Sequence, residues 1–260
     1  MWMIFINTQE VLTAGNWGRI KINNLPFALS EQQINIFKSV LQKNKINTIL
    51  DVSCGNGDFA VLLSKWGKKV TVLEPDPLKI IDLRSKFEQD GFTIDICAGE
   101  MRDLSRIYRT QSDLISCLKN SLSELLSVED IWGTLAQMYL KLKPSGILII
   151  HTLNYDRILN EDSSQVTVLR EYYQGSIIEL LFMNMEGGER ANLIFKTVLL
   201  NGQKDEVIIP VRPILKKELN LWLAELGFEK IKNDDSFDCK SSNTNGYHRI
   251  TVAYRPGSSR

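Results

Sequence analysis

The chain has 260 residues, of which 43% are hydrophobic and 24% are charged, a balance typical of a globular protein with an ordinary core. Its 31 basic residues equal its 31 acidic ones, so it lacks the basic excess common in nucleic-acid-binding domains. The four cysteines show no Cys-x-x-Cys spacing and only two histidines are present, which argues against a zinc site and a secreted disulfide framework. No apolar run reaches the ~18 residues of a membrane span, and the short apolar start lacks the basic region of a signal peptide. We therefore expect a cytoplasmic protein with reduced thiols, no metal, and neither a membrane nor a nucleic acid as partner.

Strands and helices alternate along the first 150 or so residues. Ser30 and Gln33 form a capping box that predicts the start of the first helix. Strands are predicted at 48–52, 69–74, 92–97, 113–118 and 147–152, and helices at 31–43, 59–63, 77–89 and 128–142. Short apolar strands separated by helices are typical of a parallel sheet buried between two helix layers. The sequence therefore predicts a doubly wound α/β fold.

The pattern changes after about residue 160. β-rich runs at 165–173, 176–183, 191–200 and 206–211, with Gly187-Gly188 and Asn201-Gly202 between them, predict hairpins. A helix predicted at 214–226 and strands predicted at 228–233 and 247–254 then resume the alternation of helices and strands. We expect an N-terminal helical or cap segment over 1–45 and one domain over 46–260, which carries an antiparallel insertion at 160–212. Whether the insertion is a lid or an interface, and whether the chain forms an oligomer, stays open.

A glycine-bearing turn, Asp51-Val52-Ser53-Cys54-Gly55-Asn56-Gly57-Asp58, connects the first predicted strand of the sheet to a helix. Small residues at this edge of a sheet let a ligand approach the backbone closely. Glu74 ends the next strand, 19 residues after Gly55. A carboxylate in this place accepts two hydrogen bonds from ribose hydroxyls, so the pattern predicts a nucleoside-containing ligand.

Two ligands fit this turn. Gly55-x-Gly57-x-x-Ala60 matches the dinucleotide fingerprint, which would indicate an NAD-binding oxidoreductase. Asp51 and Asp58 flank the turn, however, and two carboxylates repel a pyrophosphate. They suit the ammonium and sulfonium groups of S-adenosylmethionine (SAM). The sequence therefore favours SAM, with NAD as the alternative.

The segments that follow come in a matching order. Glu100 and Met101 follow the third strand, where an acid and a backbone amide suit an adenine ring, and the end of strand 113–118 would face the methyl group. Together with Lys143-Pro144-Ser145-Gly146, these segments resemble the motif series of the class I SAM-dependent methyltransferases. The resemblance implies a seven-stranded sheet of order 3-2-1-4-5-7-6 with strand 7 antiparallel.

Two segments resemble the glycine N-methyltransferase branch more closely. Cys117–Leu122 is similar to its C-L-G-N-S-F segment, and 149–159 is similar to its strand ending D-H-R-N-Y-D-x-I-L. Leu153 stands where the branch has the arginine that holds the glycine carboxylate, and Lys119 stands where it has glycine. Loss of a bidentate carboxylate partner is not conservative. The resemblance therefore implies a small-molecule amine acceptor other than glycine, with Arg212 or Lys119 as a replacement cation.

Methyl transfer from a sulfonium is an in-line displacement that needs alignment and exclusion of water, so no catalytic triad is expected. Position and resemblance give three candidate catalytic residues: Asn120 and Tyr155 as acceptor contacts and His151 as base. The candidate cofactor-binding residues are Asp51, Ser53, Gly55, Gly57, Glu74, Pro75, Glu100, Met101, Leu118, Trp17 and Arg19. A methyltransferase of RNA or protein is a further alternative, but the chain lacks an Asn/Asp-Pro-Pro-Tyr/Phe segment after the fourth strand.

Overall fold

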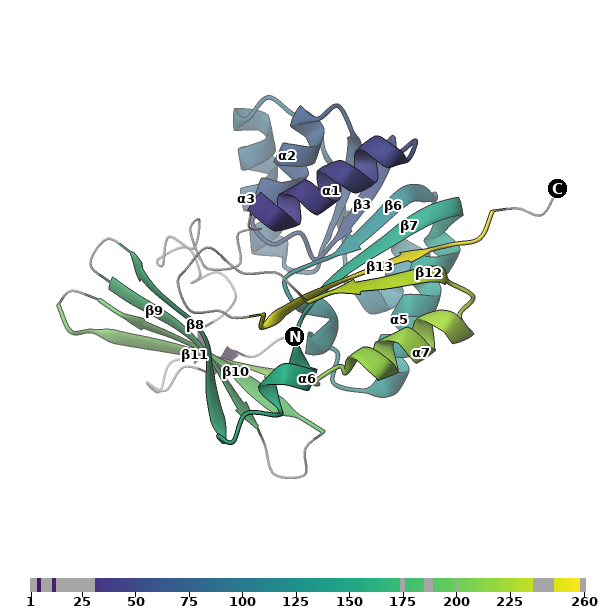
Figure 1. The fold of residues 1–260 in the computed structure, drawn as a ribbon. Coiled ribbons are helices and arrows are strands. Elements are labelled where there is room, and N and C mark those ends of the chain that lie inside the picture. Colours follow the sequence, from purple (N-terminus) through teal and green to yellow (C-terminus); the bar gives the residue numbers. More distant parts are fainter. Residues whose placement is uncertain are drawn as a thin grey trace.

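The computed structural model describes residues 4–5, 11–12, 31–173, 176–184, 189–199, 201–235 and 246–257. The described strands form two sheets, a main sheet of seven strands and a second sheet of six, which lie beside each other (Figure 1). Among the described residues, no helix is both long and apolar enough to cross a bilayer.

The main sheet has the order β12-β13-β7-β6-β3-β4-β5. Its strands are β3 (Thr48–Val52), β4 (Lys69–Glu74), β5 (Asp95–Ala98), β6 (Ser112–Cys117), β7 (Leu142–Leu153), β12 (Glu229–Asp234) and β13 (His248–Tyr254). The five strands from β3 to β7 are parallel, and β13 runs antiparallel to β7. Counted along the main sheet, this is the order 3-2-1-4-5-7-6 with strand 7 antiparallel, so the predicted fold is confirmed.

Helices cover both faces of the main sheet. The helices α1 (Glu31–Lys43), α2 (Asp58–Lys65) and α3 (Pro77–Gln89) lie together at one side, and α5 (Val128–Lys141) and α7 (Lys216–Glu225) lie at the other (Figure 1). Phe37, Phe59 and Leu83 belong to the first buried core, whereas Ile131 and Leu219 belong to the second, which also includes the short helix α4 (Leu104–Ile107). Two cores separated by one sheet are the arrangement expected of a doubly wound fold.

Two predicted boundaries are wrong for local reasons. The strand expected at 92–97 begins only at Asp95, because the amide of Phe92 still donates to the carbonyl of Phe87 (2.9 Å) and closes helix α3. The strand expected to begin at 147 begins at Leu142 and includes Lys143-Pro144-Ser145-Gly146, with a register shift that brings Ile147 opposite Leu114. Backbone bonds between residues 145–146 and 255–256 hold this irregular stretch in the sheet.

The second sheet contains the predicted antiparallel insertion. It has the order β2-β1-β11-β10-β9-β8. Its strands are β1 (Ile4–Phe5), β2 (Val11–Leu12), β8 (Gln165–Tyr173), β9 (Ser176–Asn184), β10 (Ala191–Val198) and β11 (Lys204–Val211). The N-terminal strands thus extend the insertion, while α1 packs into the core of the main sheet through Phe37. A division of the chain at residue 45 stays a prediction.

A third core joins the two sheets where β7 ends. Leu153, Tyr155 in the short helix α6 (Tyr155–Ile158), and Ile158 pack against Phe182 and Leu193 of the second sheet. The end of β11 is also bonded to the 3-10 helix η4 (Ser121–Glu124), since the Arg212 amide donates to the Ser123 carbonyl (2.8 Å). The second sheet therefore lies at the edge where the parallel strands of the main sheet end.

Candidate active site

The glycine turn after β3 has a left-handed backbone at three positions. Ser53, Gly55 and Gly57 have φ of 62°, 62° and 76°. A Cβ on Gly57 would lie 2.6 Å from Leu83 and 2.8 Å from Phe87, so only glycine lets the turn pack on α3. A Cβ on Gly55 would meet only the side chain of Lys119. Gly57 is therefore required by packing. The space next to Gly55 is limited only by the side chain of Lys119.

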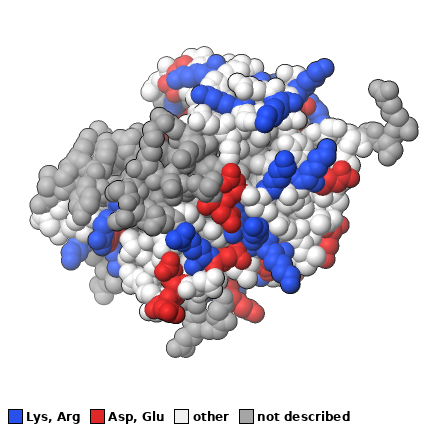
Figure 2. Space-filling model, viewed as in Figure 1, with Lys and Arg blue, Asp and Glu red and all other residues white. Residues whose placement is uncertain are grey.

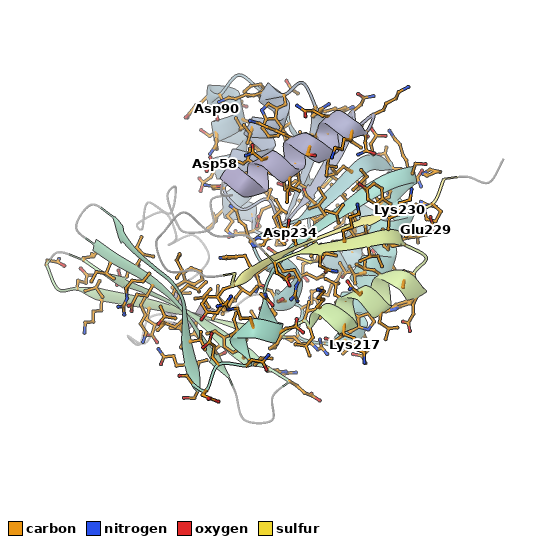
Figure 3. All side chains as sticks on the ribbon, in the orientation of Figure 1. Asp58, Asp90, Lys217, Glu229, Lys230 and Asp234 are labelled. Carbon is orange, nitrogen blue, oxygen red and sulfur yellow. The ribbon has the colours of Figure 1, made fainter. Side chains whose placement is uncertain are left out.

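The two acids that flank this turn have different surroundings. Asp51 is 2% exposed and accepts a hydrogen bond from the Ser116 hydroxyl (2.7 Å). Burial raises the pKa of Asp51 to about 6, although Ser116 and the charge of Lys119 oppose this shift. Asp58 is exposed at the start of α2, where Lys86 and Asn56 bind its carboxylate (Figure 3). Lys86 neutralises Asp58, so of the two acids only Asp51 has no ion pair among the described residues.

Glu74 lies at the end of β4, beside the glycine turn. It is buried, accepts a hydrogen bond from the Asp76 amide (3.1 Å), and lies 4.0 Å from the ammonium of Lys79. Burial raises its pKa, and Lys79 and the Asp76 amide counter that effect. The exposed Pro75 follows it. This is the place of a carboxylate that accepts hydrogen bonds from ribose hydroxyls.

The predicted adenine segment follows β5. The carboxylate of Glu100 is bound by the guanidinium of Arg102, which also lies 3.4 Å from Asp130. Met101 begins a 3-10 helix (Met101–Asp103) and packs, half-buried, against the second core. An adenine amino group would therefore have to compete with Arg102 for Glu100. Trp17 and Arg19 lie outside the described residues.

The loop after β6 is the most irregular part of the site. Leu118 is buried in the core, and the next two residues, Lys119 and Asn120, have φ of 57° and 66°. The Lys119 amide donates to Nδ1 of His151 (3.2 Å), and the Asn120 amide donates to the His151 carbonyl (3.0 Å). Two adjacent non-glycine residues in this backbone region store strain, which the end of β7 holds in place.

The three predicted catalytic residues meet around this loop, but all are buried. The Asn120 side-chain amide donates to the Tyr155 hydroxyl (2.8 Å), and its oxygen accepts from the Leu153 amide (3.0 Å). His151, Asn120 and Tyr155 are 3%, 2% and 0% exposed. Their hydrogen bonds connect the loop to β7 and α6. Because all three side chains are buried, they stabilise the loop and do not line the site.

His151 has no free ring nitrogen for the predicted role of base. Its Nδ1 accepts from Lys119, and its Nε2 lies 3.0 Å from Nδ1 of His248. These contacts place the proton of His151 on Nε2, because Nδ1 is the acceptor. Burial first, and the neighbouring His248 and Lys119 next, lower the pKa of His151 well below its usual value. The ring therefore acts as a neutral support of the Lys119–Asn120 loop, and the geometry does not support proton transfer through it.

Glu124 was missed in the sequence. It ends η4 half-buried and has neither a hydrogen bond nor an ion pair with the described residues. Burial raises the pKa of Glu124 to about 7, with Lys79 opposing and Glu74 adding to the shift. No local pattern marks it, because its place depends on how η4 folds back after Asn120.

The two departures from the glycine N-methyltransferase pattern have clear structural settings. Leu153 is fully buried in the core shared with the second sheet. Arg212 is held by both carboxylate oxygens of Glu218 (3.0 and 2.5 Å) and lies over the ring of Trp222. Of the two suggested replacement cations, only Lys119 is without an ion pair in the described part of the chain.

Comparison with known proteins relates this chain to methyltransferases. Residues 49–146, from β3 into β7, match a family model described as a methyltransferase domain. The chain carries a class I SAM-dependent methyltransferase domain. It is 27% identical over 209 residues to a glycine/sarcosine/dimethylglycine N-methyltransferase of Actinopolyspora halophila, covering 80% of this chain and 36% of that protein. It is 27% identical over 205 residues to a glycine/sarcosine N-methyltransferase of Halorhodospira halochloris, covering 78% and 73%.

The fold of this domain is also shared with a solved structure. A SAM-dependent methyltransferase from Clostridium acetobutylicum superposes with a TM-score of 0.72 at 14% identity, covering 93% of this chain and 98% of that one. SAM is the cofactor of the domain, so the NAD alternative is set aside. The chain spans about a third of the length of the first relative.

Proposed function

We propose that this protein transfers a methyl group from SAM to the nitrogen of a small-molecule amine. The observation that carries this proposal is Glu124, a partly accessible carboxylate that has no hydrogen bond or ion pair with the described residues, beside the end of β6. A carboxylate there attracts an ammonium and accepts the proton that an amine must lose. The two relatives named above, whose names describe N-methylation of amines, support the same choice of acceptor.

In this proposal, the residues of the chain mainly bind and align. SAM supplies a methyl group on a sulfonium, which is a good leaving group. Glu74 holds the ribose, and the buried Asp51 favours the positive end of the cofactor. Bound SAM would supply the methyl group, and Glu124 would accept the proton that the amine nitrogen loses on methylation. The apolar core around Leu153 and Tyr155 excludes water below the acceptor.

The acceptor is proposed to be a small amine other than glycine. Leu153 offers no partner to an acceptor carboxylate, and Arg212 is already bound by Glu218. On the part of the face in Figure 2 that is formed by described residues, acidic and uncharged side chains interrupt the basic ones, so this part offers no continuous basic surface for RNA.

Thermal unfolding with SAM, S-adenosylhomocysteine and NAD in parallel tests the cofactor. A ligand at about 100 times its dissociation constant adds about 2.7 kcal/mol of stability, so both SAM species should shift the transition and NAD should not. Turnover with glycine, sarcosine, ethanolamine and an amino sugar then tests the acceptor class. No shift with either SAM species would contradict the proposal, and methylation of an oxygen acceptor alone would contradict its amine part.

A further inference from the structure

Lys119 is held in a conformation that lysine does not favour. Its φ of 57° lies in the left-handed region, where most non-glycine residues are uncommon, and Asn120 beside it has φ 66°. Bonds from the amides of both residues to His151, together with the Asn120 side chain, keep the loop in this shape. Glycine would suit the backbone better, so the side chain of Lys119 is retained at a cost to stability.

That side chain lies over the glycine turn of β3. Its Nζ is 3.3 Å from the point where a Cβ on Gly55 would lie. The ammonium has no hydrogen bond or ion pair with any residue that the structure describes. Burial lowers the pKa of Lys119, while the charges of Asp51 and Asp58 act from a distance in the opposite direction. A half-buried ammonium without a direct partner is unfavourable, which points to an anionic group that completes the site.

The order of the strands indicates which anion this is. The neighbours in the sheet are β6-β3-β4-β5. If adenine lies beyond β5 and the ribose lies at Glu74 on β4, the amino-acid tail of SAM continues over the β3 turn towards β6. Lys119 reaches this turn from the end of β6. The tail carries the only negative group of the cofactor, its carboxylate.

We infer that the Lys119 ammonium binds the carboxylate of the methionine tail of SAM at the Gly55 turn. This inference rests on the proposed function, since it requires SAM in this site. It also assigns Lys119 to the cofactor and not to the carboxylate of an amino-acid acceptor.

Calorimetric titration of the full chain with two nucleosides tests the inference. S-adenosylhomocysteine keeps the amino-acid tail, and 5′-methylthioadenosine lacks it. Lys119→Gly suits the left-handed backbone, and Lys119→Met keeps the length of the side chain without its charge. Both variants should bind S-adenosylhomocysteine about 10- to 100-fold more weakly, the range expected for a lost charge-assisted hydrogen bond, and should bind 5′-methylthioadenosine within about twofold of the unaltered chain.

Lys65→Met is the matched control, because Lys65 is an exposed lysine in the last turn of α2, the helix that follows the same turn. It should leave the affinity for both nucleosides within about twofold. Unchanged binding of S-adenosylhomocysteine by both Lys119 variants would overturn the inference, as would an equal loss for both nucleosides, which would indicate a structural role. If the unaltered chain binds neither nucleoside, the proposed function itself fails, so the two failures are distinguishable.

Discussion

The strands β3 and β6 lie side by side, and one acidic residue lies near each end of this pair. The amino end and the carboxyl end of the pair can therefore be compared directly. At the amino end, Asp113 accepts from the amide and hydroxyl of Thr48 (2.8 and 2.9 Å) and from the ammonium of Lys143 (2.9 Å). At the carboxyl end, Asp51 accepts a side-chain bond from Ser116, and the nearby Lys119 ammonium has no ion pair among the described residues. At the amino edge of the sheet the charged side chains pair with each other. At the carboxyl edge Asp51 and Lys119 have no ion pair among the described residues and are available to a ligand.

The same contrast is visible in the proton affinities. Partial burial of Asp113 opposes ionisation, but bonds from Lys143, Thr48 and Asn47 outweigh it and lower its pKa to about 2. Burial dominates for Asp51 and raises its pKa to about 6. Shifts in opposite directions on one pair of strands indicate that the amino edge contributes to stability, whereas the carboxyl edge costs stability in the absence of ligand.

The largest effect is expected for Glu74→Gln, which removes the charged acceptor for the ribose but keeps its shape. Loss of two charge-assisted hydrogen bonds should weaken S-adenosylhomocysteine binding about 100-fold, or about 2.7 kcal/mol, as measured by calorimetry. The exposed acid Glu88, changed to Gln, is the control on α3 and should leave the affinity unaltered. An affinity within threefold of the unaltered chain would remove Glu74 from the cofactor site.

Asp51→Asn should make the free protein more stable and weaken cofactor binding. Because the pKa of Asp51 is raised from 3.8 to about 6 on folding, the folded chain keeps a proton that the unfolded chain loses across this range. The stability cost of the aspartate therefore grows between about pH 4 and pH 6 and stays constant above. We expect the variant to gain about 2 kcal/mol at pH 7.5 relative to its difference at pH 4, by urea unfolding. A difference that does not change with pH would contradict the assigned role of burial.

Asp113→Asn should give the smallest effect and one of the opposite sign. Its pKa is lowered on folding, so its contribution is present above about pH 4 and is lost as the pH falls towards 2. The variant should lose about 1.5 kcal/mol of stability at pH 7, with little difference near pH 2. Binding of S-adenosylhomocysteine, measured on the same sample, should not change. A loss of affinity here would break the division between a stabilising edge and a binding edge.

The sequence allowed the sheet and the cofactor edge to be predicted, because both depend on local signals. Apolar strands, the glycines at 55 and 57, and Glu74 at a strand end are each visible in a short window. The contact of His151 with His248 joins residues 97 positions apart, and it occupies a ring nitrogen of the base that the sequence suggested. The contact of Glu100 with Arg102 and the burial of the Asn120 side chain could not be predicted from the sequence either, because both depend on the directions of side chains.

The third core, which joins the two sheets where β7 ends, has a consequence for engineering this fold. Leu153, Tyr155 and Ile158 follow the main sheet in the chain, yet their apolar surface is covered by strands of the second sheet. Excising the insertion as a cassette would leave these three side chains facing water, and a transplanted insertion would need a matching set beneath it. Transfer of the insertion between such proteins therefore has to move the last residues of β7 and the whole of α6 together with it.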